Sequence, residues 1–357
     1  MDNKIDIDLL EKLVRIRSLS KNHEQCLLAL EVVKEKLDSQ QVPCFVDSNN
    51  DFPFLIAGDG KLADTLILCH IDIVPASDEQ FTIRVDKNKI CGRGVLDMKG
   101  PLVAALESFL HLWKIGRRQF LFAVTSDEEI GGFNGTSTFT GTVFKNIKNA
   151  IIPDSTGDDL VLIQKAPFHI KLNSTGKSCH GSKPWEGINA ADKLLGCCNE
   201  IIKLINHNSP DLTSACLSQF HSGDATNKVP DNAMATIDIR IREEKEVGEV
   251  VKIINQSSFK WDCSWEKIDE PMFFEAKIGD LFLKKWVLAF TTVNGRKPNT
   301  KVESGASDAR FLWNDLKIPV IVTSVMGGGA HSDYEWADLE SLNWLSKTII
   351  NFGLEQL

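Results

Sequence analysis

The chain has 357 residues, 43% hydrophobic and 25% charged, which is the composition of an ordinary globular protein with about two domains or one domain that carries an insertion. Its net charge of −9 argues against a nucleic-acid-binding surface, and no apolar run approaches the roughly 20 residues that a membrane-spanning helix needs. The acidic, amphipathic start does not resemble a signal peptide, and nine scattered cysteines without a CxxC pair favour reduced thiols and a cytoplasmic location.

Residues 1–166 alternate predicted helices and buried strands. The predicted elements are helical segments within 5–39, strands at 42–47, 53–57 and 65–69, a hairpin over 81–91, a helix over 98–115, and strands at 119–125 and 149–153. A proline at the start of the 98–115 helix is well placed. This alternation indicates an α/β unit with a mixed sheet.

The pattern changes near residue 166. The run FHIKLN at 168–173 alternates apolar and polar residues, as a half-exposed strand does. Further predicted elements are helices over 188–206 and 244–257 and a strand over 233–240. From residue 277 the first pattern resumes, with helices over 279–293 and 338–353 and a strand over 318–324. We therefore expect an α+β unit, 167–276, inserted between two parts of the α/β unit, 1–166 and 277–357.

Residues with metal-binding side chains follow the predicted strands of the α/β unit. They are His70 and Asp72 after the strand at 65–69, Asp97 in a glycine-rich turn, Glu128 and Glu129 after the strand at 119–125, Asp154 after the strand at 149–153, and His331 beside a run of three glycines. Each one alone has an ordinary explanation, such as a core histidine, a helix cap or a solvated surface pair. Open α/β sheets form their sites at the carboxyl ends of strands, so the set as a whole favours a site.

These residue types favour divalent cations as the ligand. Mixed histidine and carboxylate ligation without cysteine suits zinc, cobalt or manganese, and there are enough ligands for two ions that share a bridging carboxylate. Asp72 follows His70 by two residues, so both side chains point to one face of an extended backbone. This is the spacing of a carboxylate that orients a ligating imidazole.

Five motifs occur in an order that resembles a known family. LILCHIDIVPAS, GRGVLDMKGPL, TSDEEIGG, GKSCHGSKPWEGINA and GAHSDYE resemble the dinuclear zinc hydrolases that include succinyl-diaminopimelate desuccinylase, acetylornithine deacetylase, aminoacylase, glutamate carboxypeptidase and several di- and tripeptidases. The resemblance covers nearly the whole chain. It implies an α/β, mixed-sheet catalytic domain (1–166 and 277–357) with an inserted α+β lid or dimerisation domain (167–276), and hence a homodimer.

The resemblance also implies roles for the residues at the strand ends. His70 and Asp154 would bind one ion, Glu129 and His331 the second, and Asp97 would bridge the two. Glu128 would be the general base, taking a proton from the attacking water. The expected cofactors are two zinc ions, with cobalt or manganese as alternatives.

Five residues are expected to contact the substrate or the reacting carbonyl. His180 would reach the active site of a neighbouring subunit and stabilise the oxyanion. Asn227 and Arg240 match family positions that contact the substrate carboxylate or the carbonyl, although a strand arginine that faces solvent is an equally good explanation of Arg240. Gly305 and Arg310, in SGASDARF, match the site of the substrate carboxylate, which an arginine can grip with two hydrogen bonds.

The substrate is the least defined part of this prediction. Asp154 stands where many acylases and carboxypeptidases of the family have glutamate, and aspartate there is more typical of its aminopeptidases and dipeptidases. The short chain, the compact insertion and SGASDARF favour the desuccinylase and deacetylase branch. We therefore expect metal-dependent hydrolysis of a small N-acyl amino acid, in amino-acid biosynthesis, with a dipeptidase or carboxypeptidase as the alternative.

Two other classes remain as rivals. A metallophosphatase fits the ligand types but not the motifs, and a non-catalytic relative would not need the complete set of base and ligands. The expected partners are the N-acyl amino acid or short peptide and a second copy of the chain, with no nucleic acid and no membrane.

Overall fold

A computed structural model describes residues 4–206, 209–277 and 279–355. It divides into two compact units. The first comprises the chain up to Leu162, Glu275–Lys301 and the chain from Ser307, and the second comprises Ile163–Phe274 and Val302–Ala306. The boundaries expected from the sequence, after residues 166 and 276, fall within a few residues of two of these borders. Their assignment to a catalytic and a lid domain stays a prediction.

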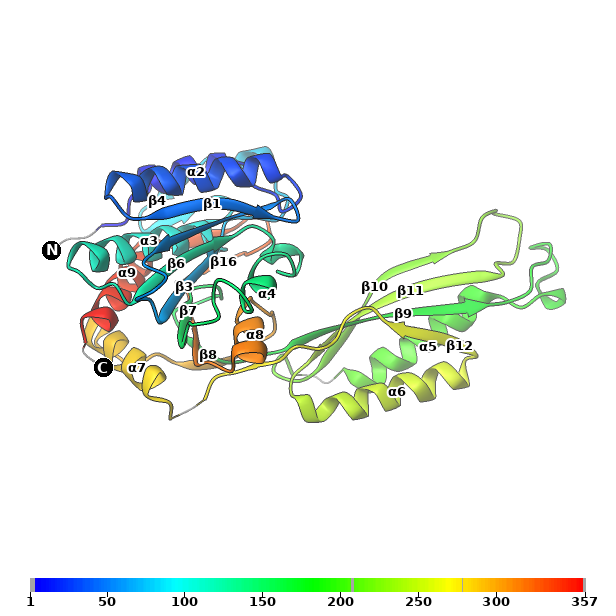
Figure 1. Cartoon of the computed structure of the whole chain (residues 1–357). Coiled ribbons are helices and arrows are strands. Elements are labelled where there is room, and N and C mark those ends of the chain that lie inside the picture. Colours follow the sequence, from blue (N-terminus) through cyan, green and yellow to red (C-terminus); the bar gives the residue numbers. More distant parts are fainter. Residues whose placement is uncertain (1–3, 207–208, 278, 356–357) are drawn as a thin grey trace. The chain divides into compact units, whose positions relative to one another are not determined.

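The first unit contains most of the helices (Figure 1). They are α1 (Ile7–Arg15), α2 (His23–Ser39), α3 (Lys99–Lys114), α4 (Thr136–Phe139), α7 (Leu281–Asn294), α8 (Ala309–Phe311) and α9 (Leu339–Leu354), with single turns η1 (Asp78–Phe81), η2 (Glu128–Ile130) and η5 (Leu312–Leu316). In the described parts of the chain, no helix is both long enough and apolar enough to cross a membrane.

A nine-stranded sheet forms the centre of this unit. Its order is β1 (Cys44–Asn49), β2 (Phe52–Gly58), β6 (Phe120–Thr125), β3 (Thr65–His70), β7 (Asn149–Ile152), β15 (Val320–Val322), β8 (Leu160–Gln164) and β13 (Phe274–Glu275), and β14 (Thr300–Glu303) pairs with β8. A smaller sheet has the order β16 (Gly327–Gly328), β17 (Trp336–Asp338), β5 (Lys89–Cys91) and β4 (Arg84–Asp86).

The large sheet is mixed, as predicted. Strands β6, β3, β7 and β15 run parallel, while β1 pairs antiparallel with β2, β2 with β6, and β8 with β15. His70, at the end of β3, lies opposite Thr125, at the end of β6. Because the carboxyl ends of parallel strands meet at one edge, the segments that follow β3, β6 and β7 emerge side by side.

Helix α3 begins against the loop that precedes it. A Cβ atom on Gly100 would lie 2.0 Å from the carbonyl oxygen of Val95, so only glycine allows this close approach. Nζ of the buried Lys99 donates hydrogen bonds of 2.8 Å to the carbonyls of Leu13 and Ile16, at the end of α1. The start of α3 is therefore joined both to α1 and to the loop that carries Asp97.

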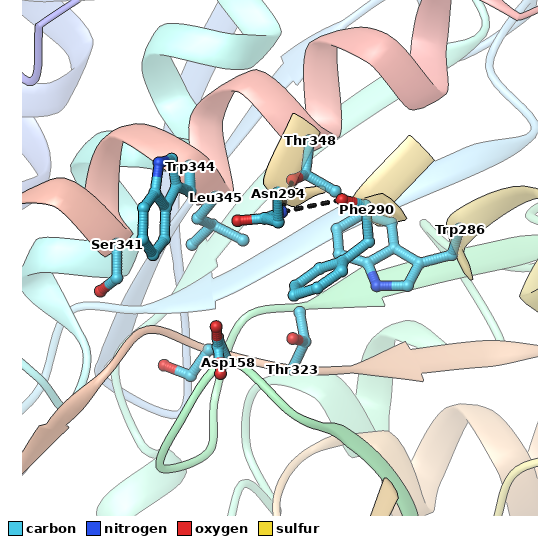
Figure 2. Close-up of a pocket in the computed structure, with 10 residues that line it drawn as sticks. Asp158, Trp286, Phe290, Asn294, Thr323, Ser341, Trp344, Leu345 and Thr348 are labelled. Atoms are coloured by element: carbon cyan, nitrogen blue, oxygen red, sulfur yellow. Dashed lines mark hydrogen bonds between the residues drawn. The ribbon is translucent and has the colours of Figure 1, made fainter. Parts of the chain in front are cut away.

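A small cavity of about 10 Å³ lies among α7, α9 and the segment after β15 (Figure 2). Its lining includes Trp286, Asn294 and Ser324, whose Nε1, Oδ1 and Oγ atoms have no hydrogen-bond partner within the described residues. This volume is close to the minimum that a single ordered water molecule needs. None of the predicted site residues lines this cavity.

The second unit is a four-stranded antiparallel sheet with two helices. Its sheet order is β10 (Ser214–Ser222), β11 (Asn232–Ile241), β9 (Ala166–Thr175) and β12 (Cys263–Lys267), and its helices are α5 (Ala190–Ile205) and α6 (Val247–Lys260), with turns η3 (Pro184–Glu186) and η4 (Glu244–Glu246). Alternate residues of β9 and β11 are buried and pack with α5 and α6 in one apolar core. The other face of these strands is half exposed, as the alternation in the sequence predicts.

Candidate metal centre

Two histidines of the first unit flank a single carboxylate. His70 is 2% exposed, and its Nε2 atom lies 3.2 Å from Oδ1 of Asp97. Nε2 of His331 lies 3.1 Å from Oδ2 of the same side chain. Asp97 thus has one oxygen beside each imidazole, which is the arrangement of a carboxylate that bridges two cations.

Three more carboxylates complete the cluster. Oε2 of Glu129 lies 3.0 Å from Nε2 of His331, and Oδ1 of Asp154 lies 4.0 Å from Nε2 of His70. Two sets of three side chains have ligand atoms within 4.8 Å of one another: His70, Asp97 and Glu129, and His70, Glu128 and Asp154. The structure therefore gathers the five expected ligands and the expected base, with Glu128 on the side of His70 and Asp154.

Burial and mutual repulsion shift the acidities of these carboxyl groups. Burial raises the pKa of Asp154 to about 8, with the charges of Asp97 and Glu129 adding to the effect and His70 opposing it. Burial, then the charge of Asp154, raises the pKa of Glu128 well above its usual value. Burial acts in the same direction on Asp97, but hydrogen bonds from His331 and His70 outweigh it and hold the pKa of Asp97 below its usual range.

The donor set fits divalent cations. Oε1 of Glu129 is buried and has no hydrogen-bond partner among the described residues, although its other oxygen contacts His331. A buried carboxylate oxygen without a donor is costly unless a cation or proton satisfies it. Imidazole nitrogen and carboxylate oxygen are ligands of zinc, cobalt and manganese, so the residues present suit two such ions.

Asp72 connects the two halves of the cluster. It is fully buried, its carbonyl lies 3.0 Å from Nδ1 of His70, and its carboxylate lies 3.4 Å from the same atom. The carboxylate also accepts hydrogen bonds from the backbone N–H groups of Glu128 and Glu129 (3.3 and 3.1 Å) and from the hydroxyl of Ser20 (2.6 Å). Asp72 therefore orients the His70 ring mainly through its carbonyl, and its side chain fixes the turn that carries both glutamates. The contact with Ser20 was not predicted.

Asp308, which the sequence analysis did not single out, holds the loop after Glu129. Its Oδ2 accepts a hydrogen bond of 2.5 Å from Thr136, and a Cβ atom on Gly132 would lie 2.2 Å from its Oδ1. Gly132 also has a φ of 69°, which favours glycine. Burial raises the pKa of Asp308 to about 7. Its place between Gly305 and Arg310 in SGASDARF was the signal that could have identified it.

Arg310 contacts the same loop. It is 9% exposed, its Nη2 donates to the carbonyl of Gly131 (2.7 Å), and its guanidinium lies 4.9 Å from the ring centre of Phe311. The structure thus places Arg310 beside the segment of the two glutamates. Its predicted contact with a substrate carboxylate stays a prediction.

The remaining predicted residues belong to the second unit. His180 and Asn227 are exposed and lie in adjoining segments, since Gly181 donates to the carbonyl of Asn227 (2.7 Å). Nδ1 of His180 accepts the N–H of Ser182 (3.2 Å) and lies 2.8 Å from its hydroxyl. A neutral His180 therefore has its proton on Nε2 and offers that N–H as a donor.

Arg240 already has a carboxylate partner within the second unit. Its Nε and Nη2 donate to the two oxygens of Asp238 (2.8 and 3.0 Å), and Asp238 lies 3.5 Å from Nε2 of His169. A substrate carboxylate would compete with Asp238 for this guanidinium. Gly305 is exposed, and a Cβ atom on it would have no neighbour within 4 Å.

A mixed α/β sheet whose strand ends gather two histidines and four carboxylates defines a metal-dependent hydrolase. The family model described as Peptidase family M20/M25/M40 matches residues 66–352, and the chain belongs to this family. The protein is therefore a metallohydrolase that acts on amide bonds, which confirms the class expected from the five motifs.

Relatives of known name are similar over most of their length. The succinyl-diaminopimelate desuccinylase of Rickettsia bellii (strain OSU 85-389) is 26% identical over 323 residues, covering 81% of this chain and 80% of that protein. The enzyme of the same name from Blochmanniella pennsylvanica is 24% identical over 368 residues, covering 95% of each.

Solved structures share the fold. A tripeptidase from Staphylococcus aureus has a TM-score of 0.81 at 20% identity, covering 98% of each chain. An M20 family metallo-carboxypeptidase from Sulfolobus solfataricus has a TM-score of 0.78 at 18% identity, covering 99% of each. The likeness confirms the expected mixed α/β fold with its additional antiparallel sheet.

Metal-stripped protein is expected to bind two equivalents of zinc. Asp154→Asn and His331→Ala should each lose one equivalent, because they remove a ligand from opposite sides of Asp97. Isothermal titration and elemental analysis measure the number, with Glu31→Gln, an exposed residue of α2, as the control that keeps both. One equivalent in the unmodified protein would contradict a two-ion site.

The same titration should release protons. The pKa of Asp154 in the folded protein, about 8, lies above its unfolded value of 3.8, so the carboxyl group of metal-free protein is protonated at pH 7. The contribution of this protonated carboxyl group to stability is lost as the pH rises through about 8. Zinc displaces the proton. Release at pH 7 should therefore be smaller in Asp154→Asn, and an unchanged release would remove Asp154 from the site.

Proposed function

We propose that the protein hydrolyses the amide bond of a small N-acyl amino acid, as a succinyl-diaminopimelate desuccinylase or acetylornithine deacetylase does. The main support is the position of Glu128. It lies with His70 and Asp154, while Asp97 faces both histidines and Glu129 contacts His331. Glu128 is therefore available as a carboxylate beyond those needed to hold two ions.

The chemistry that the site supports is attack of water on a carbonyl carbon. Bound cations would polarise the amide carbonyl and lower the pKa of the attacking water. Glu128 takes a proton from this water and delivers it to the leaving amine as the C–N bond breaks. Burial disfavours the charged form of Glu128, which suits this side chain to hold the proton between these steps. Asp72 keeps the glutamate turn and the His70 ring in register.

A dimer would complete the site. We propose that the second unit pairs with a second copy of the chain and that Nε2–H of His180 donates to the oxyanion in the partner's site. Two features support this. The tautomer implied by the Ser182 contact has its proton on Nε2, and β10 is a largely exposed edge strand, a kind of surface that pairs readily.

The substrate class rests on the named relatives. Two desuccinylases match 80% or more of their own length, so an N-succinyl or N-acetyl amino acid is the first candidate, with Asn227, Arg240, Gly305 and Arg310 as proposed contacts. A dipeptidase or carboxypeptidase is the second candidate. Asp154 fits the dipeptidase branch, and a solved tripeptidase and a solved carboxypeptidase share the fold. Nine free cysteines fit a reducing cytoplasm. We also propose a role in amino-acid biosynthesis, which the cysteines do not address.

A substrate panel on zinc- and cobalt-loaded protein tests this proposal. We expect N-succinyl and N-acetyl amino acids to be hydrolysed and free dipeptides and a generic phosphoester to be inert. Release of the amine from each substrate is the measurement. Turnover of unblocked dipeptides alone would replace the proposal with a peptidase, and turnover of the phosphoester alone with a phosphatase.

Glu128→Gln is expected to lower kcat about 10²- to 10⁴-fold, the contribution of a general base. Both zinc equivalents should remain, because the amide removes the base and leaves the other ligands in place. Steady-state kinetics and metal analysis measure the two effects, with Glu31→Gln as the control. Loss of a zinc equivalent would show instead that Glu128 is a ligand on the His70 side.

A mixture of His180→Ala and Glu128→Gln proteins should recover activity if His180 acts across a dimer. A mixed dimer has one site with both side chains, so free exchange gives about a quarter of the unmodified activity. Light scattering establishes the dimer, and differently tagged subunits establish the mixing. Verified mixed dimers without activity would place His180 in its own subunit's site or outside catalysis.

A further inference from the structure

Two charged residues outside the ligand cluster are buried against each other in the first unit. Arg93 and Glu335 are 2% and 0% exposed, and Nη1 of Arg93 lies 2.5 Å from Oε2 of Glu335. Removing two charges from water is costly, and an apolar pair of similar volume is often at least as stable. Stability alone is therefore a weak explanation of this pair.

The place of the pair in the chain connects it to the predicted ligands. Arg93 precedes Asp97 by four residues, and Glu335 follows His331 by four. Each member thus belongs to a loop that carries one ligand. The two loops are 234 positions apart in the sequence, by subtraction of 97 from 331, so only the fold brings them together.

Glu335 holds the backbone of the Asp97 loop at several points. Its Oε1 accepts the N–H groups of Leu96 (2.9 Å) and Asp97 (3.1 Å), and its own carbonyl accepts the N–H of Gly92 (3.3 Å). Arg93, which binds Oε2 of Glu335 through Nη1, also donates through Nη2 to the carbonyl of Pro75 (3.2 Å). One side chain therefore fixes the peptide groups on the N-terminal side of Asp97.

His331 lies on the loop that leads to Glu335. It is 53% exposed and has a φ of 63°, in a loop that begins with Gly329 at a φ of 73°. The loop rejoins regular structure at β17, where Trp336 pairs with Cys91 of β5. Glu335 is the residue just before this pairing, so it joins the two loops where they approach the ligands.

We propose that Glu335, supported by Arg93, is a positioning residue that sets the separation of Asp97 and His331. Glu335 would thereby affect the affinity for the cation at Asp97, Glu129 and His331. It would affect the cation at His70 and Asp154 less. The inference rests on the proposed function only in requiring that the protein bind divalent cations. It needs no particular substrate.

Two double variants isolate the hydrogen bonds from the charges. Arg93→Met with Glu335→Gln removes both charges but keeps an oxygen for the N–H groups of Leu96 and Asp97. Arg93→Met with Glu335→Leu removes both charges and the oxygen, in a side chain of similar size. Zinc and cobalt affinities are measured by stepwise titration of metal-free protein, and His331→Ala identifies the step that belongs to the His331 side.

We expect the Gln variant to keep both affinities within about threefold of the unmodified protein. The Leu variant should bind the ion on the His331 side about 10- to 100-fold more weakly, the usual effect of losing a group that orients ligands. Its cobalt absorption spectrum should change for that step only. Equal affinities in the two variants, or equal weakening of both steps in the Leu variant, would overturn the positioning role.

A stability control separates positioning from general destabilisation. Ile349→Ala opens a cavity at a fully buried position of α9 and should lower Tm while both metal steps stay unchanged. If either double variant does not fold, Glu335→Asp keeps the charge and shortens the reach, and it should weaken the His331 step selectively. Unmodified protein without two metal steps would refute the proposed site itself, an outcome distinct from a failure of Glu335.

Discussion

Repulsion among buried carboxylates is the main constraint on the side-chain cluster of the first unit. Asp97, Glu128, Glu129 and Asp154 meet with two imidazoles at one edge of the sheet, where burial makes each negative charge costly. Such a cluster is compatible with a stable fold only when cations or protons neutralise its charge. The parallel register of β6, β3 and β7 creates the crowding, because it brings the segments after these strands to the same edge.

The residues around the cluster show how the arrangement is kept rigid. Asp72 binds the glutamate turn and the His70 ring, and Asp308 and Arg310 hold the loop that follows the glutamates. Glu335 does the same for the Asp97 loop. Asp72, Arg310 and Glu335 hydrogen-bond to backbone groups, whereas Asp308 accepts from the hydroxyl of Thr136. Three of the four side chains therefore hold the backbone of a segment that carries predicted ligands.

Much of the fold could be predicted because its main elements have strong local patterns. The helices predicted over 98–115, 188–206 and 338–353 correspond to α3, α5 and α9 within about two residues, and the buried runs at 65–69 and 119–125 are β3 and β6. The sequence analysis missed β8, β13, β14 and the turn at Leu312–Leu316. β13 and β14 are short, and β8 is an internal strand of five residues, so the pairing of all three depends on tertiary contacts.

The site residues, like the fold, could be predicted where the signal is local in the sequence and not where it depends on distant contacts. Ligand types at strand ends could be predicted from one segment at a time. The motif SGASDARF could have pointed to Asp308, but the contacts of Asp308 and Glu335 are with residues 172 and 238 positions away, and no local pattern predicts those partners. The contact between Arg240 and Asp238, in contrast, could have been predicted from the sequence. Residues two apart on a strand share a face, so the sequence DIR already placed an acid beside the guanidinium.

The order of the predicted ligands along the chain separates the two proposed cation positions during synthesis. His70, Asp97, Glu129 and Asp154 all precede the second unit, and His331 follows it. A ribosome therefore completes the donors on the His70 side long before it reaches the last donor of the other side. The complete set of donors for both cations can form only after His331 has been synthesised. His331 lies in the segment that returns to the first unit after the whole insertion.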